Sequence, residues 1–180
     1  KHPDVGMSKR KEVHYFDDEN IFSKSKVNPS DYSNQFDFAA GKSIYGETTP
    51  IYMYWEPCMR RIWEYNREIQ LIAILRDPAD RAFSHWNMQR NDYPKTKDFL
   101  ECLADEESWI KKALPFQPRG HAFLDRGFYS HQIRRMFRFF YPEQLLFLKY
   151  ETFLAQQEET IHEICRFLKI DQSLLTIQRE

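Results

Sequence analysis

The chain has few of the residues that form cross-links and flexible loops, and it lacks a long hydrophobic run. Its 180 residues include three cysteines and five glycines. No apolar run reaches the roughly 18 residues of a membrane-spanning helix, so no membrane span is expected. Three widely spaced cysteines allow at most one disulfide and favour free thiols in a reducing compartment. The formal net charge of −1 gives no global signal for nucleic-acid binding, so any anion site must be local.

Two further absences reduce the number of possible functions. No glycine-rich loop containing a lysine is present, which argues against a nucleotide kinase with a Walker loop. His162 and Cys165 lie three residues apart on a predicted helix, but without a second such pair no metal site is expected. The length fits one domain, 1–180. No signal peptide opens the chain, which does not begin with methionine, and we expect a domain that is incomplete at both ends.

The most informative stretch is a short apolar run that leads into a helix. Residues 69–75 are almost wholly apolar, which predicts a strand buried on both faces. Arg76 follows the strand, Asp77 is a predicted N-cap, and Pro78 suits the first turn of a helix. The expected apolar stripe of that helix consists of Ala79, Ala82, Phe83 and Trp86.

A phosphate site is predicted at this junction. Ser84 lies off the apolar stripe, and Arg76 stands at the carboxyl end of the strand. Open α/β sheets bind ligands in that crevice, where a guanidinium fork and a hydroxyl suit a phosphate. The alternative is a structural turn with a surface ion pair, which is the commoner fate of such a motif.

The order of the remaining elements predicts an α/β fold with a parallel sheet flanked by helices. A strand at 44–50, a helix at 56–65 and the strand at 69–75 predict a right-handed crossover. A second buried strand is expected at 144–150. Further helices are expected at 98–114, 129–140 and 158–168.

Near the start of the chain, residues 12–17 read as a short extended segment. Alternation would place Glu12 and His14 side by side on one face. A carboxylate and an imidazole at that spacing can share a proton, as acid–base catalysis requires. The alternative is an exposed strand with solvated polar groups.

The predicted helix 129–140 has a basic side. That side carries His131, Arg134, Arg135 and Arg138. It could bind an acidic partner, although charged helix faces are more often simply solvated. A non-catalytic module that binds polyanions or nucleotides therefore stays open as a second function.

Four stretches, taken in order, resemble a known family. They are 11–17 (KEVHYFD), 46–52 (GETTPIY), 75–84 (LRDPADRAFS) and 126–144, which opens with RGFY and ends with YPEQ. Together they resemble the sulfotransferases that use 3′-phosphoadenosine 5′-phosphosulfate. The likeness is greatest to the branch of heparan sulfate 3-O-sulfotransferases and bacterial, cyanobacterial-type relatives.

The resemblance implies a P-loop-related sulfotransferase fold and a role for each matching residue. Arg76 and Ser84 match the positions that bind the 3′-phosphate of the donor. Glu12 matches the general base, with His14 and Asp17 at neighbouring active-site positions. The implied acceptor is a hydroxyl on a glycan, a lipid, a polyketide or a small molecule, with no metal and no nucleic acid.

The chain also departs from the family pattern. The loop that binds the 5′-phosphosulfate is absent, as is the C-terminal glycine-basic loop, and Thr48 stands where some relatives have a lysine. We therefore expect these 180 residues alone to transfer no sulfate. The expected location is the cytoplasm for a bacterial protein, or the Golgi lumen for a eukaryotic one.

Overall fold

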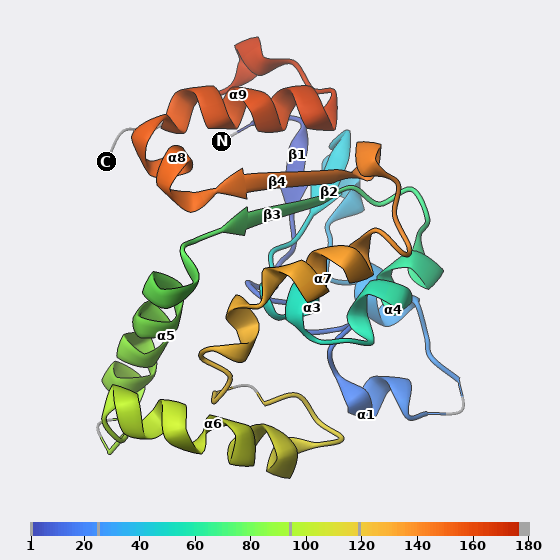
Figure 1. The fold of residues 1–180 in the computed structure, drawn as a ribbon. Coiled ribbons are helices and arrows are strands. Elements are labelled where there is room, and N and C mark those ends of the chain that lie inside the picture. The colour runs from blue at the N-terminus through green and yellow to red at the C-terminus, as the bar shows by residue number, and fades with distance from the viewer. Residues whose placement is uncertain (1, 25, 94, 119, 177–180) are drawn as a thin grey trace.

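The computed structural model describes residues 2–24, 26–93, 95–118 and 120–176, and within them helices surround two small parallel sheets (Figure 1). One sheet pairs β1 (Val5–Met7) with β2 (Ile44–Gly46), and the other pairs β3 (Leu71–Leu75) with β4 (Leu145–Lys149). The helices are α1 (Glu19–Phe22), α2 (Ser30–Ser33), α3 (Ile51–Tyr54), α4 (Cys58–Tyr65), α5 (Pro78–Asp92), α6 (Phe99–Ala113), α7 (Tyr129–Met136), α8 (Tyr150–Ala155) and α9 (Gln157–Leu168).

The predicted α/β class is confirmed, but the strand pairing differs from the expected crossover. The strand at 44–46 pairs with β1 and not with β3, so the segment that connects β2 to β3 links two sheets. The partner of β3 comes instead from far along the chain, with Leu71 opposite Leu145 and Leu75 opposite Lys149. Sequence pattern identifies a strand but not its neighbour, because the register is set by tertiary contacts.

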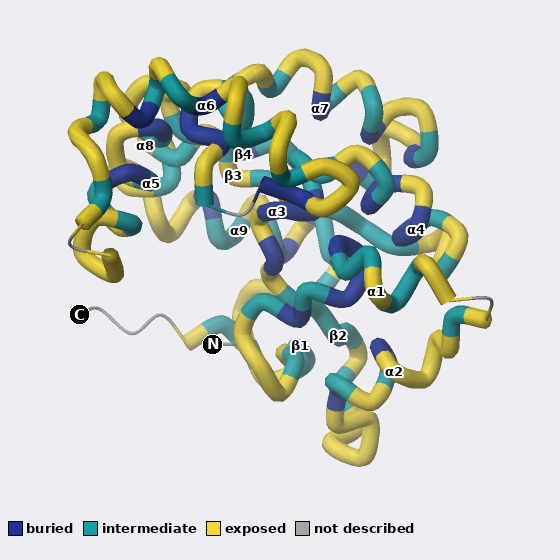
Figure 2. Tube along the Cα trace, turned by 90° about the horizontal axis from the view of Figure 1, so that it is seen from below, coloured by how far each residue is buried: buried dark blue, intermediate teal, exposed yellow. Residues whose placement is uncertain are grey.

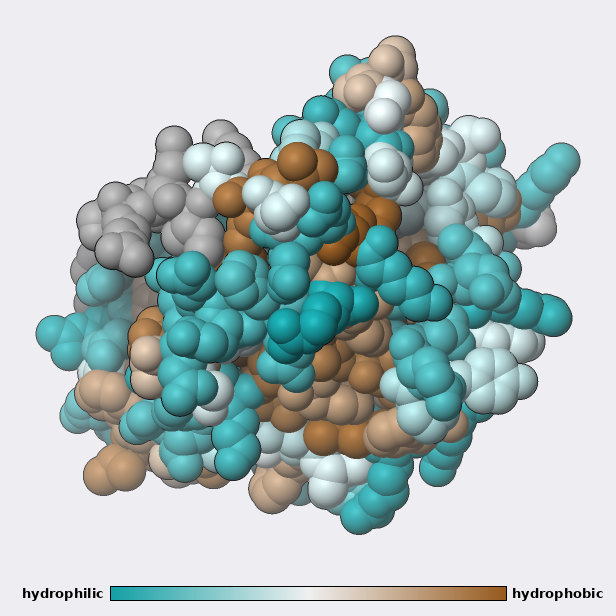
Figure 3. Space-filling model, turned by 90° about the horizontal axis from the view of Figure 1, so that it is seen from above, coloured by the Kyte–Doolittle hydropathy of each residue, from teal (hydrophilic) through white to brown (hydrophobic). Residues whose placement is uncertain are grey.

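The prediction that 69–75 is buried on both faces is wrong. Along β3 the residues alternate between half-buried and exposed, and Ile72 and Ile74 are 38% and 47% exposed. Among the described residues β3 has one strand neighbour, β4. The molecule also shows hydrophobic side chains in the middle of the face drawn in Figure 3, ringed by hydrophilic ones.

The main core is aromatic and lies under α3, α4 and the segment that precedes α1 (Figure 2). Phe16 is 1% exposed and packs edge-on against Tyr15, Tyr52 and Tyr65 at centroid distances of 5.1 to 5.6 Å. Edge-to-face aromatic pairs at this range are favourable beyond the area they bury. The segment that follows Glu12 is therefore part of the core and does not lie on its surface.

The start of α5 follows the prediction. The Asp77 side chain accepts hydrogen bonds from the backbone N–H groups of Ala79 and Asp80, and Pro78 is the first helical residue. The predicted apolar stripe is confirmed at Ala82 and Trp86, which are buried, and is wrong at Ala79 and Phe83, which are exposed.

Candidate active site

The segment from Glu12 to Asp17, here called the base loop, is not the predicted strand. Glu12 and His14 both have left-handed backbones, with φ of 52° and 55°. That conformation is costly for residues other than glycine and persists only where surrounding contacts impose it. Val13, Tyr15 and Phe16 are all buried, so the expected alternation of faces does not occur. The two left-handed residues turn the polar side chains outward between buried anchors.

The base loop nevertheless brings the three predicted side chains together. His14 Nδ1 lies 2.9 Å from Asp17 Oδ2, and His14 Nε2 lies 3.4 Å from Glu12 Oε2. The Asp17 side chain is fully buried, His14 is 26% exposed and Glu12 is 39% exposed. A buried carboxylate thus orients an imidazole, whose other nitrogen faces a carboxylate that solvent can reach. A buried carboxylate that fixes the orientation of an imidazole ring is also found in the triads of hydrolytic enzymes.

A fourth residue of this cluster was missed by sequence reasoning. Gln117 is 8% exposed, and its amide Nε2 donates a hydrogen bond to Asp17 Oδ2. The two residues are 100 positions apart in the chain, so no local spacing pattern points to the pair. The structure therefore adds Gln117 to the cluster of Glu12, His14 and Asp17.

Of the two predicted phosphate-binding residues, Arg76 lies at the junction of β3 and α5, whereas Ser84 lies about two turns into α5. Arg76 is partly buried, with its guanidinium 5.3 Å from the ring centre of Tyr150. Within the part of the chain that the structure describes, no carboxylate lies within 4.0 Å of the Arg76 guanidinium, although Glu151 is near enough to interact with its charge. Ser84 is exposed on α5. A phosphate is bound well by a fork-shaped cation and an accessible hydroxyl, which Arg76 and Ser84 respectively supply.

The RGFY stretch packs directly against this junction. Tyr129 OH donates to the backbone carbonyl of Arg76 over 3.0 Å. A Cβ atom added to Gly127 would lie 3.1 Å from Pro78 Cβ, closer than most such contacts. Two of the four stretches that carry the family resemblance are therefore one structural unit, and the glycine is what allows their close approach.

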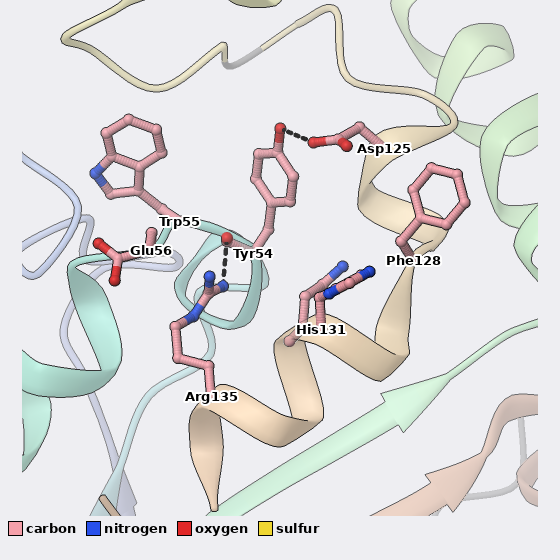
Figure 4. Close-up of a pocket in the computed structure, with 8 residues that line it drawn as sticks. Tyr54, Trp55, Glu56, Asp125, Phe128, His131 and Arg135 are labelled. Atoms are coloured by element: carbon pink, nitrogen blue, oxygen red, sulfur yellow. Dashed lines mark hydrogen bonds between the residues drawn. The ribbon is translucent and has the colours of Figure 1, made fainter. Parts of the chain in front are cut away.

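A cavity of about 410 Å³ opens between α3 and α7 (Figure 4). Aromatic side chains and four ionisable ones line it: Tyr54, Trp55, Glu56, Asp125, Phe128, His131, Gln132 and Arg135. Tyr54 OH donates to Asp125 Oδ2 over 2.6 Å, and burial, followed by that hydrogen bond, raises the pKa of Tyr54 above its ordinary value. An apolar wall with a few oriented polar groups is typical of a small-molecule site.

One wall of the cavity is held by a buried carboxylate on α6. Glu106 is 5% exposed and accepts hydrogen bonds from three successive backbone N–H groups, those of Phe123, Leu124 and Asp125, at 3.0, 2.9 and 2.8 Å. These bonds fix the backbone from which Asp125 reaches Tyr54. They also compensate for the burial of the Glu106 charge.

The basic side of α7 is only partly solvated. Arg134 and Arg138 are exposed, as a solvated face predicts. Arg135 instead donates to the backbone carbonyls of Met53 and Tyr54, at 2.8 and 2.6 Å, and lines the cavity. Its charge is thus committed to holding α3, which weakens the case for a surface that binds polyanions.

Across 2–24, 26–93, 95–118 and 120–176, no group of three or more His, Cys, Asp or Glu side chains is placed to hold a metal ion. Over the same ranges, no helix has the length and apolar character needed to cross a bilayer.

Comparison with solved structures defines the class of fold. The chain superposes on a sulfotransferase from Alicyclobacillus acidocaldarius with a TM-score of 0.84, at 24% identity, over 99% of this chain and 77% of that one. The strands, the helices and the loop clusters described above therefore form a sulfotransferase fold.

The sequence comparisons give the family. The sulfotransferase domain family matches residues 54–180, and the chain belongs to that family. Mouse heparan sulfate glucosamine 3-O-sulfotransferase 5 is 22% identical over 172 residues, which are 94% of this chain and 47% of the mouse protein. A membrane-associated sulfotransferase of Dictyostelium discoideum is 26% identical over 60% of this chain and 24% of its own length. The chain thus spans about half or less of these curated relatives.

Proposed function

We propose that the protein transfers a sulfuryl group from 3′-phosphoadenosine 5′-phosphosulfate to an acceptor hydroxyl, with Glu12 as the general base. The observation that carries the proposal is the cluster in which buried Asp17 orients His14, and His14 in turn contacts the accessible carboxylate of Glu12. Membership of the sulfotransferase family supplies the reaction class.

The proposed roles follow from chemistry. Glu12 takes the proton from the acceptor hydroxyl while the acceptor oxygen forms a bond to sulfur. The bond between sulfur and the oxygen of the 5′-phosphate breaks, which leaves a sulfate ester and 3′,5′-bisphosphoadenosine. His14 and Asp17 hold Glu12 in place, while Arg76 and Ser84 bind the 3′-phosphate. Such a reaction depends on positioning and charge stabilisation rather than on a protein nucleophile.

The donor site is supported by the groups present at the β3–α5 junction. Among the described residues the Arg76 guanidinium has no carboxylate within 4.0 Å, and Ser84, about two turns into α5, is exposed. These are suitable contacts for a phosphate dianion. In this proposal Arg76 and Ser84 contact the 3′-phosphate of the donor.

We assign the acceptor to the cavity between α3 and α7, which none of Glu12, Arg76 and Ser84 lines. Tyr54, Trp55 and Phe128 offer apolar faces, and Glu56 and His131 offer polar contacts at its rim. The acceptor is an alcohol, and the relatives named for heparan sulfate glucosamine make a glycan one of the candidates. The three cysteines are buried and free, which favours a reducing compartment such as the cytoplasm.

The experiment that tests the proposal uses the purified full-length protein, because the 180 residues alone are expected to transfer no sulfate, together with a donor labelled in its sulfuryl group and a panel of alcohols. Label appearing in an acceptor, together with one bisphosphonucleoside bound in a calorimetric titration, supports it. Absence of nucleotide binding contradicts it, as does binding that leaves every acceptor unlabelled, including glycans, lipids and phenols.

A further inference from the structure

Glu19 connects the base loop to the cavity. Its carboxylate accepts three hydrogen bonds: Trp55 Nε1 donates to Oε1 over 2.6 Å, and Arg61 donates to Oε1 over 3.0 Å and to Oε2 over 2.7 Å. The pair with Arg61 is bidentate, and the two side chains are 21% and 8% exposed. Geometry of this kind gives charge-assisted bonds that are short and directional.

The same arginine reaches the base loop. Arg61 donates a further hydrogen bond to the backbone carbonyl of Phe16 over 2.8 Å. Phe16 directly precedes Asp17, the buried carboxylate that orients His14. Its carbonyl also accepts from the thiol of Cys58 at 3.4 Å. The end of the base loop is thus held to α4 by a charged side chain and a thiol.

Trp55 is the other end of the connection. Its side chain lines the cavity, and the bond to Glu19 fixes the orientation of the indole ring. The backbone around it belongs to the turn between α3 and α4, which no strand supports. Without the Glu19 carboxylate, the indole would keep its packing against the core but lose the hydrogen bond of its N–H group.

Local sequence does not explain why Glu19 sits here. α1 has four residues, too few to be stable as an isolated helix, so tertiary contacts must hold it. Burial opposes ionisation of Glu19, but hydrogen bonds from Arg61 and Trp55 outweigh it, and the pKa of Glu19 lies below its ordinary value. The carboxylate is therefore charged at neutral pH and binds both donors as an anion.

We propose that Glu19 is a positioning residue that fixes the base loop and the acceptor cavity relative to each other. One carboxylate holds Arg61, which holds the backbone beside Asp17, and the same carboxylate holds Trp55, which forms a wall of the cavity. This role rests on the proposed function, since it assumes that the acceptor lies in the cavity and that Glu12 is the base.

The test is a double-mutant cycle of Glu19→Gln and Trp55→Phe in the purified protein. Trp55→Phe keeps the ion pair and removes only the indole, so it should raise the acceptor KM several-fold and leave kcat within about twofold. Glu19→Gln should raise the acceptor KM and also lower kcat by roughly tenfold, because it loosens both connections. The double variant should have the KM of Glu19→Gln alone, since the indole is already misplaced.

A readout without turnover keeps this inference separate from the proposed function. The emission of Trp55 is obtained as the difference in fluorescence between the wild-type protein and Trp55→Phe. The same difference, taken in the Glu19→Gln background, should be quenched more strongly by acrylamide. Glu64→Gln is the matched control, because Glu64 pairs with Arg60 on the exposed side of α4 at 3.9 Å and should change neither quenching nor kinetics.

Two results would overturn the inference. One is an unchanged quenching of Trp55 in folded Glu19→Gln; the other is a cycle in which the KM effects of the two variants multiply. If the wild-type protein transfers no sulfate at all, the proposed function fails, and the quenching experiment still decides whether Glu19 positions Trp55. If Glu19→Gln does not fold, Glu19→Met combined with Arg61→Met removes both charges and should give the same quenching increase.

Discussion

The base loop and the β3–α5 junction are built in opposite ways. In the base loop, Glu12 and His14 adopt left-handed backbones, and the loop is held by contacts from α4 and from Gln117. At the junction, a regular strand runs into a capped helix, and Tyr129 and Glu151 add hydrogen bonds to its backbone from far along the chain. The backbone of the base loop is imposed by distant contacts, whereas that of the junction follows local signals that distant contacts support.

This difference matches the two proposed tasks. A general base must be held at one geometry relative to the reacting hydroxyl, and a misplacement of about 1 Å can cost on the order of a hundredfold in rate. A phosphate-binding pair tolerates more movement, because the ligand itself completes the contacts. We therefore expect substitutions in the base loop to affect the rate and the fold, and substitutions at the junction to affect donor binding.

The largest expected effect separates these two tasks. Glu12→Gln keeps the shape of the side chain and removes the proton acceptor, so kcat should fall by about 10²- to 10⁴-fold. The Kd for 3′,5′-bisphosphoadenosine, measured by calorimetry, should stay within about twofold, because Glu12 does not contact the 3′-phosphate in the proposed arrangement. A variant that keeps its turnover would remove Glu12 from the role of base.

The second effect concerns the fold of the base loop. Asp17→Asn presents an amide to the His14 ring and to the Gln117 amide, and leaves buried groups without an acceptor. The free energy of unfolding should drop by about 1–3 kcal/mol in urea denaturation. Asp18→Asn is the control. Asp18 caps α1 from a partly exposed position, and asparagine can accept the same bond, so the change should stay within about 0.5 kcal/mol. If the two variants lost the same free energy of unfolding, the burial of Asp17 would not be the cause of the loss.

The same comparison explains what could be predicted from the sequence. The start of α5 was predicted to the residue, because an N-cap aspartate and a first-turn proline are local signals. The grouping of Glu12, His14 and Asp17 was expected from the family resemblance, whereas the strand predicted for them was wrong. No pattern of alternation reveals two left-handed residues, since the backbone there is imposed by Tyr15 and Phe16 in the core.

Long-range partners set the other limit. Gln117, Glu106 and Arg61 each act on residues 17 to 100 positions away, so neither periodicity nor spacing identifies them. The open face of β3 was missed for the same reason. An apolar run predicts a strand, but its burial depends on which elements pack on it.

A smaller effect is expected at the junction. Arg76→Ala should raise the Kd for 3′,5′-bisphosphoadenosine tenfold or more, because a charged contact to phosphate is worth about 1.5–3 kcal/mol. Ser84→Ala should raise it less, since it removes one neutral donor. Arg134→Ala is a suitable control on the exposed side of α7. Nucleotide binding that survives Arg76→Ala but is lost when salt is raised would favour the module that binds polyanions.

The smallest expected effect tests whether the junction really is a local structure. Asp77→Ala removes the acceptor for the N–H groups of Ala79 and Asp80, at 2.9 and 3.1 Å, and should lower the free energy of unfolding by about 1 kcal/mol. Asp80→Ala removes a first-turn charge without removing the cap, so a loss of about 0.3–1 kcal/mol that disappears at high salt is expected. Because Arg76 precedes the cap, the Kd of the protein for 3′,5′-bisphosphoadenosine should change by less than about threefold in Asp77→Ala. A larger change would mean that the junction, like the base loop, depends on a cooperative network, and the contrast between the two regions would no longer hold.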